Sequence, residues 1–521
     1  MQLMNDGRQA RNCESNLRIP GGYLAAVALL IGFISHAYNV FQYPLYLGDE
    51  GIYTEQAWSV IREGRLSPYT YFYDHAPAGW ILQAAWTMLL PKQFLTWGVA
   101  INSGRVLMVF IHVLSVYLLF KVVVALSRST SAAFLVCLVF SLSPLGLYYQ
   151  RMVLLDNIMV LWLLLAIHLL TNNRGRLLPM LISGLAFGLA LVTKENALFF
   201  APVIGYMLYL QVKGTYRARF AFAGWMFAWG AVASVYPLYA VLKGELLPAG
   251  ALDFTGRPQE HVSLIETIAW QLGRSGGSVF DPGSRFWYFW NGFWWPKDSL
   301  ILAGGAVAVL GCLGVGLAEH RREKGYLVAA LLSLSFAFYL TRGSEMLAFY
   351  IVPLLPFLAM SIGMLVDKLI RVTPRRMRSA AFVLVVLSFT GLYLSLSRDH
   401  YTLNLTQEQN QQLQFIRDNI PPDANIVIDD DLWVDLHERN DQWPVFPKAH
   451  SHWKVEDDPE IQVGVLGGDW RNIDYIVMSD DLIDTFNYNK EQFVLAAYQN
   501  SRVIAQFEKG DVMVQVRQVN K

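Results

Sequence analysis

Long apolar runs dominate the first 400 residues of this chain. A helix needs roughly 20 apolar residues to cross the hydrocarbon layer of a bilayer. Runs of about that length predict about eleven transmembrane helices, at 21–41, 99–126, 131–149, 152–171, 178–194, 196–212, 219–242, 299–318, 325–341, 346–367 and 379–397. The run at 79–90 is shorter, so we expect a helix lying in the membrane interface. The pattern predicts an all-α polytopic membrane protein.

The pattern changes at about residue 399, where polar and acidic residues replace the apolar runs. "LTQEQNQQLQFIRDN" predicts a helix, which a Pro-Pro turn ends. "NIVID" and "IDYIVMS" predict strands, and "RVIAQFEKGDVMVQVRQV" predicts a hairpin around Lys509 and Gly510. A small α/β domain is therefore expected over 399–521. The run Asp429, Asp430, Asp431 is compatible with a cation site, but a solvated strand end is the better expectation.

Composition supports a membrane protein. Of the 521 residues, 54% are hydrophobic and only 16% are charged, which is too apolar for an ordinary soluble domain. Lys plus Arg and Asp plus Glu are equal at 41 each, so the charge gives no reason to expect nucleic acid as a partner. Cys13, Cys137 and Cys312 form no CxxC motif and offer no loop disulfide.

The orientation follows from Lys and Arg, which concentrate in cytoplasmic loops. The first apolar run is too long for a signal peptide, so the tail 1–20 is expected in the cytoplasm and 21–398 form the transmembrane domain. Every short basic loop then falls on the cytoplasmic side. The loops 42–98 and 243–298 and the domain 399–521 become extracytoplasmic. We therefore expect a multi-pass protein of the plasma membrane with its active site and C-terminal domain outside the cytoplasm.

Five polar motifs fall on this outer face, at the ends of different apolar runs. Ionisable residues at such places are costly and usually mark a site or a pathway. The motifs are "YLGDEGIYTEQAW" (46–58), "YDHAPAGW" (73–80), "YYQRMVLLDN" (148–157), "LVTKEN" (191–196) and "TRGSEMLAFY" (341–350). Together they predict a pocket that binds an anion and removes a proton.

The acidic candidates for catalysis are Asp49 and Glu50, which begin an amphipathic helix. A helix cap is their structural alternative, because acids are favoured at helix N-termini. Glu55, almost two turns further on, is expected on the polar side of that helix. The cationic candidates for holding a donor phosphate are His75, Arg151, Lys194 and Arg342, and the remaining site candidates are Asp74, Asp156, Glu195 and Tyr350.

The cationic and remaining candidates also have structural alternatives. Arg151 and Asp156 lie five residues apart and could form an ion pair. Lys194 and Glu195 could be a tight hairpin tip between two helices. Arg342 could be an ordinary exposed loop charge. It is the convergence of all these groups on one face that favours a functional site.

A lipid-linked phosphate suits this combination of groups. It is anionic, its tail stays in the bilayer, and its phosphate sits at the height of the predicted cations. Arg and Lys would hold the phosphate and stabilise it as a leaving group. A carboxylate such as Asp49 could take the proton from an acceptor hydroxyl while that oxygen attacks a sugar carbon. A single displacement of this kind inverts the anomeric centre.

The ordered motifs resemble a known superfamily of enzymes. "GDEGIYTEQAW", "YDHAPAGWIL", "QRMVLLDN", "TKEN" and "FYIVPLLPF" are similar to motifs of the dolichyl-phosphate-mannose protein mannosyltransferase and aminoarabinose transferase superfamily, glycosyltransferases of the GT-C fold. The resemblance covers about residues 20–400. It implies the GT-C fold, with interfacial helices at 50–63 and 79–90 over the active site.

The resemblance also implies roles for single residues. It makes Asp49 the catalytic base with Glu50 as its neighbour, and it places His75 near the carrier phosphate. Ala76 departs from the double-proline form of the family element, which weakens the match at His75. In the family, a polar pair opens the fourth span and a basic residue ends the fifth. The pair is matched here by Arg151 and Asp156, and the basic residue by Lys194.

The expected function is transfer of a sugar, mannose or a related one, from a polyprenyl-phosphate donor to a protein, lipid or glycan acceptor. We expect no cofactor and no metal, because the sequence has no His or Cys cluster with ligand spacing. A transporter or flippase for a lipid-linked sugar is an alternative, but such sites lie near the midplane, often between internal repeats. A metal-dependent oligosaccharyltransferase of the same fold is the other alternative.

Overall fold

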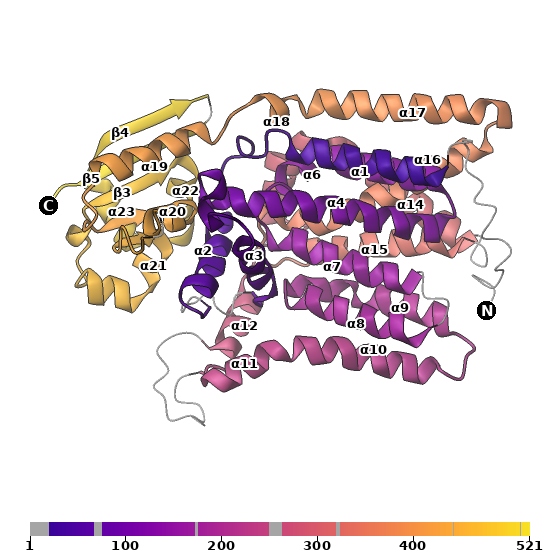
Figure 1. Ribbon diagram of the computed structural model, residues 1–521, viewed down its shortest axis with the longest axis horizontal. Coiled ribbons are helices and arrows are strands. Elements are labelled where there is room, and N and C mark those ends of the chain that lie inside the picture. Colours follow the sequence, from indigo (N-terminus) through magenta and orange to yellow (C-terminus); the bar gives the residue numbers. More distant parts are fainter. Residues whose placement is uncertain are drawn as a thin grey trace.

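The computed structural model describes residues 20–66, 75–171, 176–248, 263–318, 323–440, 442–510 and 512–521. These residues form a bundle of helices with a small sheet-containing domain at one end of it (Figure 1). Asp74, one of the expected site residues, lies outside the described residues. Arg174 and Arg321, which belong to two of the basic loops expected on the cytoplasmic side, also lie outside the described residues.

Each apolar run that predicts a span contains a helix. The bundle helices are α1 (Gly21–Ala37), α4 (Ala100–Ser127), α5 (Thr130–Leu142), α6 (Pro144–Tyr149), α7 (Leu155–Thr171), α8 (Leu177–Leu191), α9 (Ala201–Val212), α10 (Ala218–Ala233), α11 (Val235–Lys243), α14 (Trp295–Ala318), α15 (Lys324–Thr341), α16 (Leu355–Val372) and α17 (Arg375–Leu396). Among the described residues, six helical stretches are long and apolar enough to cross a membrane, and four further apolar helices have 10–17 residues. The multi-pass architecture is confirmed, and the count of eleven spans stays a prediction.

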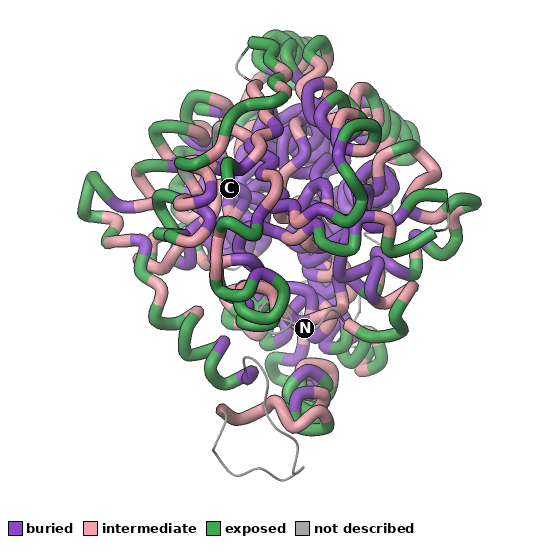
Figure 2. The backbone as a smooth tube through the Cα atoms, turned by 90° about the vertical axis from the view of Figure 1, so that its left-hand side faces the viewer, coloured by how far each residue is buried: buried purple, intermediate pink, exposed green. Residues whose placement is uncertain are grey.

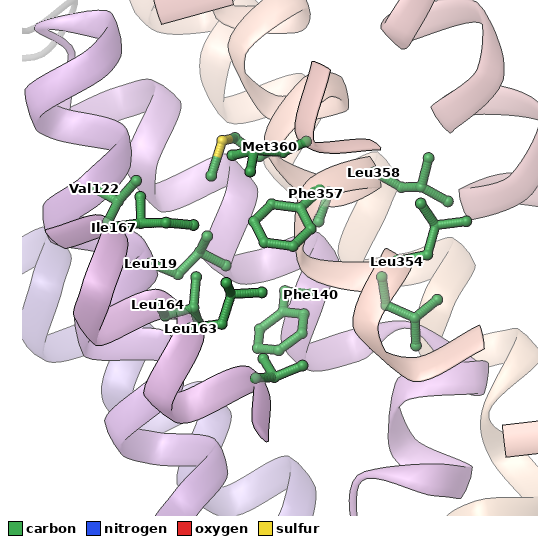
Figure 3. Close-up of a cluster of buried hydrophobic side chains, with 14 of the residues drawn as sticks. Leu119, Val122, Phe140, Leu163, Leu164, Ile167, Leu354, Phe357, Leu358 and Met360 are labelled. Carbon is green, nitrogen blue, oxygen red and sulfur yellow. The ribbon is translucent and has the colours of Figure 1, made fainter. Parts of the chain in front are cut away.

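The core of the bundle is built from large apolar side chains of α4, α5, α7 and α16 (Figure 3). Viewed from its end, the molecule has a buried interior surrounded by partly and fully exposed backbone (Figure 2). Gly363 lets α16 approach α5 closely, because a methyl group there would lie 2.6 Å from the backbone nitrogen of Val136. Small residues at such crossings allow helices in membranes to pack tightly.

Short helices cover the end of the bundle that faces the C-terminal domain (Figure 1). They include α2 (Gly48–Arg62), α3 (Ala78–Met88), α12 (Leu264–Gly273) and α13 (Arg285–Phe289). The helices α2 and α3 occupy the two stretches expected to be interfacial. With 11 residues, α3 is about 16 Å long, which is too short to cross a bilayer.

The C-terminal domain contains the expected strands. Its sheet has the order β2-β1-β3-β5-β4, in which β1 pairs in parallel with β2 and β3, while β5 is antiparallel to β3 and β4. Its elements are α18 (Arg398–Thr402), α19 (Gln407–Asn419), β1 (Ile426–Ile428), α20 (Trp433–His437), β2 (Ala449–Ser451), α21 (His452–Asp457), β3 (Tyr475–Ser479), α22 (Asp480–Asn489), α23 (Gln492–Gln499), β4 (Ser501–Lys509) and β5 (Val512–Val519).

Short irregular helical turns join the regular elements of both parts. They are η3 (Gln93–Trp97), η4 (Glu195–Phe200), η5 (Trp290–Trp294), η6 (Ala348–Leu354), η7 (Asp430–Leu432), η8 (Glu460–Val465) and η9 (Trp470–Asn472). Three of these turns matter for the site. Glu195 begins η4, Tyr350 lies in η6, and η7 carries the acidic run of the C-terminal domain.

Candidate active site

Asp49 lies in the first turn of α2 and is partly buried. Tyr53, one turn further along, points its hydroxyl at Asp49 Oδ1 at 3.5 Å. Burial raises the pKa of Asp49 to about 6; the positive groups of Lys194 and His75 act in the opposite direction. A carboxyl group with this pKa is mostly ionised at neutral pH and still accepts a proton readily, as a general base must.

Glu50 has a different environment, although it is the next residue. It is fully buried, and Arg105 of α4 donates to both of its oxygens, at 2.9 Å to Oε1 and 2.6 Å to Oε2. The backbone nitrogen of Val153 also donates to Oε1 at 2.9 Å. These contacts occupy the carboxylate, so the geometry favours a structural role over the catalytic one expected from the motif. The sequence signal for this ion pair is Arg105 itself, because a charged residue inside an apolar run usually has a partner.

Lys194 and Asp156 form a buried ion pair between the end of α8 and the start of α7. The distance from Nζ to Oδ2 is 2.6 Å, and the two side chains are 2% and 0% exposed. The Lys194 ammonium also lies 4.5 Å from the centre of the Tyr350 ring and 4.9 Å from that of Phe349. Asp156 Oδ1 is buried without a hydrogen-bond partner among the described residues. Three expected site residues therefore meet at one place.

Arg151 does not pair with Asp156. It is fully buried, and its guanidinium donates to the backbone carbonyls of Ser35 at 2.5 Å and His400 at 3.0 Å. It therefore ties α1 to the segment that follows α17. Because these N–H groups already donate hydrogen bonds to backbone oxygens, the geometry favours a structural role for Arg151 over the expected contact with a donor phosphate.

His75 is fixed by Glu195. The His75 Nδ1 atom lies 3.2 Å from Glu195 Oε2, and the backbone nitrogen of Ala76 donates to Oε1 of the same carboxylate at 2.8 Å. The His75 ring lies 6.3 Å from the ring of Tyr53, centre to centre. This contact joins the first external loop to η4 and brings His75 near Asp49.

Arg342 lies in a loop that pairs with a second external loop. Its Nε donates to Ser344 Oγ at 2.6 Å, and its guanidinium lies 4.2 Å from the centre of the Tyr339 ring. Ser344 forms a bridge with Ser275, which directly follows Arg274. Arg274 was not expected from the sequence, and its guanidinium lies 4.6 Å from the centre of the Trp270 ring. The Tyr339 ring next to Arg342 lies 6.2 Å from the Tyr350 ring, centre to centre, and the Tyr350 ring is in turn next to Lys194.

The acidic run of the C-terminal domain is buried, so the expectation of a solvated strand end was wrong. Asp430 and Asp431 are only 3% and 7% exposed. Asp430 accepts hydrogen bonds from Ser451 at 2.5 Å and from Trp453 at 3.0 Å. Burial, with a smaller contribution from Asp429, raises the pKa of Asp430 to about 7. The covering element is α2, which is almost 380 residues away in the sequence.

One group of described residues has the geometry to hold a metal ion. Asp429, Asp430 and His452 each offer one ligand atom, and these atoms lie within 4.8 Å of one another. The His452 Nδ1 atom lies 2.8 Å from Glu491 Oε2. Burial alone would lower the pKa of His452, but the contact with Glu491 outweighs it with the help of Asp430 and Asp429, so the pKa is raised. A protonated His452 would offset part of the negative charge of Asp429 and Asp430 without any ion. Asp429 and Asp430 were recognised from the sequence as compatible with a cation site, but His452 was not, because only β2 and α21 bring it to the end of β1.

Comparisons with known proteins support the fold. No protein-family model matches the sequence, and no curated protein matches it. Among solved structures, ArnT from Cupriavidus metallidurans bound to undecaprenyl phosphate is 15% identical, with a TM-score of 0.62, over 96% of this chain and 98% of that chain.

Two structures from Archaeoglobus fulgidus are also similar. The apo oligosaccharyltransferase is 12% identical with a TM-score of 0.55, over 88% of this chain and 69% of that chain. The oligosaccharyltransferase AglB in complex with an inhibitory peptide and a dolichol-phosphate is 12% identical with a TM-score of 0.54, over 95% of this chain and 74% of that chain. These likenesses, with the motifs and the arrangement of helices, show that the chain has the GT-C glycosyltransferase fold.

Proposed function

We propose that this protein is a membrane glycosyltransferase that moves a sugar from a polyprenyl-phosphate donor to an acceptor hydroxyl on the extracytoplasmic face. One observation carries the proposal. A partly buried Asp49, with its pKa raised to about 6, lies within electrostatic reach of Lys194 and His75 at one end of a GT-C fold. The ArnT structure with undecaprenyl phosphate supports a lipid-linked donor.

In the proposed reaction, the Asp49 carboxylate takes the proton of the acceptor hydroxyl. The acceptor oxygen forms a bond to the anomeric carbon from the face opposite the phosphate. The bond between that carbon and the phosphate oxygen breaks, and its electron pair leaves with the polyprenyl phosphate. One displacement therefore inverts the anomeric centre and leaves Asp49 protonated. The general base is needed because a hydroxyl group is a weak nucleophile.

Cationic side chains stabilise the charge that gathers on the leaving phosphate. Arg342 lies next to the Tyr339 ring, and the loop that follows it is bridged to Ser275, the residue after Arg274; neither arginine is fully buried. Lys194 contributes a positive charge held in place by Asp156 and by the Tyr350 ring. Fixed charges in a site shielded from water stabilise a developing anion better than solvent does. Asp156 Oδ1 has no hydrogen-bond partner among the described residues, and it would accept a hydrogen bond from a hydroxyl group of the donor sugar.

A metal-dependent oligosaccharyltransferase is the second candidate, favoured by the group Asp429, Asp430 and His452. Carboxylate and imidazole groups are suitable ligands for divalent metals. The two candidates differ in their response to chelation. We expect transfer to continue in EDTA, and loss of activity that Mn²⁺ or Mg²⁺ restores would favour the metal-dependent enzyme.

Glycoconjugate analysis of a deletion strain tests the proposal and identifies the sugar and the acceptor. We expect mass spectrometry to find one class of envelope glycoconjugate without a single sugar residue in the strain that lacks this gene. The wild-type gene should restore that residue, and the Asp49→Asn variant, expressed at the same level, should not. An unchanged set of glycoconjugates in the deletion strain would contradict the proposal.

A further inference from the structure

Three faces of α2 meet three different surroundings. Asp49 and Tyr53, one turn apart, belong to the candidate site. Glu50 pairs with Arg105 of the bundle, and Thr54, four residues later, accepts a hydrogen bond from Gln83 of α3 at 3.1 Å. Residues four apart lie on one face of a helix. The third face contacts the C-terminal domain.

The third face begins with a very close backbone approach at Gly51. A methyl group on this residue would lie 2.0 Å from the carbonyl oxygen of Asp430 and 2.4 Å from the backbone nitrogen of Asp431. Both atoms belong to the backbone of η7, so a change of rotamer cannot relieve the clash. Only glycine allows the first turn of α2, which carries Asp49, to rest on the acidic turn of the C-terminal domain.

Charged contacts continue this face along α2. Glu55 forms a buried ion pair with Lys454 of α21. Trp58 Nε1 donates to Glu438 Oε2 at 2.6 Å, and Arg62 binds both oxygens of Glu438, at 2.5 and 2.9 Å. Glu55 was expected on the polar side of α2, and this side is buried against the C-terminal domain, since Glu55 is only 3% exposed.

The spacing of these contacts makes one continuous stripe. Gly51, Glu55, Trp58 and Arg62 are separated by four, three and four residues, which keeps them on one side of an α-helix. The close backbone approach, ion pairs and hydrogen bonds described above all join them to the C-terminal domain. Removing one member of a buried ion pair leaves an uncompensated charge, so such contacts depend strongly on both partners.

We propose that Gly51 and Lys454 are positioning residues for catalysis, through which the C-terminal domain sets the place of Asp49. This inference rests on the proposed function of Asp49. The C-terminal domain is then part of the catalytic unit, since α2 reaches its position only when held between the bundle and η7. Neither residue contacts the reacting atoms in this account. They act through the orientation of α2.

The inference is tested with the purified full-length enzyme, its polyprenyl-phosphate sugar donor and its acceptor. Gly51→Ala and Lys454→Met should each lower kcat by about 10- to 100-fold, the scale expected when a catalytic group is misplaced by about 1 Å. The KM for the donor should stay within about twofold of that of the wild type, because the phosphate contacts lie elsewhere. The acidic limb of the pH profile should also shift, since the burial that raises the pKa of Asp49 changes with its position.

Matched controls separate positioning from general damage. Gly230→Ala adds a methyl group where no atom lies within 4 Å, and Lys448→Met removes an exposed lysine of the same domain. Both should keep wild-type kcat. Lys454→Arg should recover much of the activity lost in Lys454→Met, because it restores the charge opposite Glu55. A thermal unfolding curve in detergent gives the fraction of each variant that is folded at the assay temperature.

The outcomes distinguish this inference from the proposed function. Full turnover of Asp49→Asn would contradict the function itself. An inactive Asp49→Asn together with wild-type kcat in Gly51→Ala and Lys454→Met would overturn the positioning inference alone. A loss of activity that only follows the loss of folded protein, with an unchanged pH profile, would also overturn it. If Gly51→Ala does not fold, the inference is tested by the two Lys454 variants alone. It then requires a low kcat in Lys454→Met and a largely restored kcat in Lys454→Arg.

Discussion

The carboxyl group of Asp49 controls the expected pH dependence of the enzyme. Its pKa is raised from 3.8 to about 6, chiefly by burial, and a general base works only in its deprotonated form. We expect kcat/KM to be constant above about pH 7 and to fall as the pH drops through 6. Below about pH 6, kcat/KM should approach a tenfold loss for each pH unit. A profile that stays flat down to pH 4.5 would exclude Asp49 as the base.

The ion pair between Arg105 and Glu50 is expected to support stability. Both side chains are 0% exposed, so replacing Arg105 by Met leaves a buried carboxylate without its partner. Breaking a buried pair in this way costs about 3–5 kcal/mol. We expect Arg105→Met to melt at a clearly lower temperature in detergent than the wild type.

A surface pair provides the matched control for that experiment. Arg65 contacts Glu63 at 3.0 Å, and their side chains are 59% and 34% exposed. Exposed pairs of this kind contribute about 0–1 kcal/mol. Arg65→Met should therefore melt close to the wild type. Equal melting temperatures for Arg105→Met and Arg65→Met would contradict the structural role of Glu50.

The three acids of α2 show what the sequence could and could not predict at this scale. The motif and the charge pattern pointed to Asp49, whose role as the base stays a prediction; the structure shows it partly buried, with a raised pKa. The buried ion pairs of Glu50 and Glu55 were not predicted, because their partners are distant in sequence. Arg105 lies in an apolar run, and Lys454 lies about 400 residues further on. Local patterns cannot reveal contacts that only folding creates.

At the scale of elements, the close crossing of α5 and α16 is a site of tight packing. A methyl group on Gly363 would lie 2.5 Å from a side-chain carbon and 2.6 Å from the backbone nitrogen of Val136. Overpacking of this kind costs about 1–3 kcal/mol. Gly363→Ala should therefore lower the melting temperature.

Gly314 of α14 gives the control for this crossing, because no atom lies within 4 Å of the position a methyl group would take. Alanine is the better helix former, so Gly314→Ala should leave the melting temperature unchanged or raise it slightly. A Gly363→Ala variant as stable as Gly314→Ala would show that α5 and α16 do not pack as closely as described.

Apolar runs predicted the elements of the bundle well, because a helix in a membrane must satisfy its own backbone hydrogen bonds. Alternation and turn residues predicted β1, β3 and the hairpin of β4 and β5. The strand β2 was missed, since it has only three residues, Ala449–Ser451. The burial of η7 was also missed, because it depends on α2 from the other end of the chain.

At the scale of the whole molecule, the basic loops predict that the C-terminal domain lies outside the cytoplasm. In a background with Cys13→Ser, where Cys137 and Cys312 are buried, single cysteines can replace the exposed Lys509 of β4 and Lys213 after α9. An impermeant maleimide should label Lys509→Cys in intact cells and Lys213→Cys only after permeabilisation. The opposite pattern would reverse the proposed orientation.

The most direct test of the proposed function is transfer by purified, lipid-supplied enzyme with Asp49 replaced by Asn. The substitution keeps the size of the side chain and removes its ability to take a proton. We expect the rate at which sugar is transferred and polyprenyl phosphate released to fall by about 10²- to 10⁴-fold, the usual contribution of a general base. Donor binding should remain close to that of the wild type. Full turnover by Asp49→Asn would contradict the account.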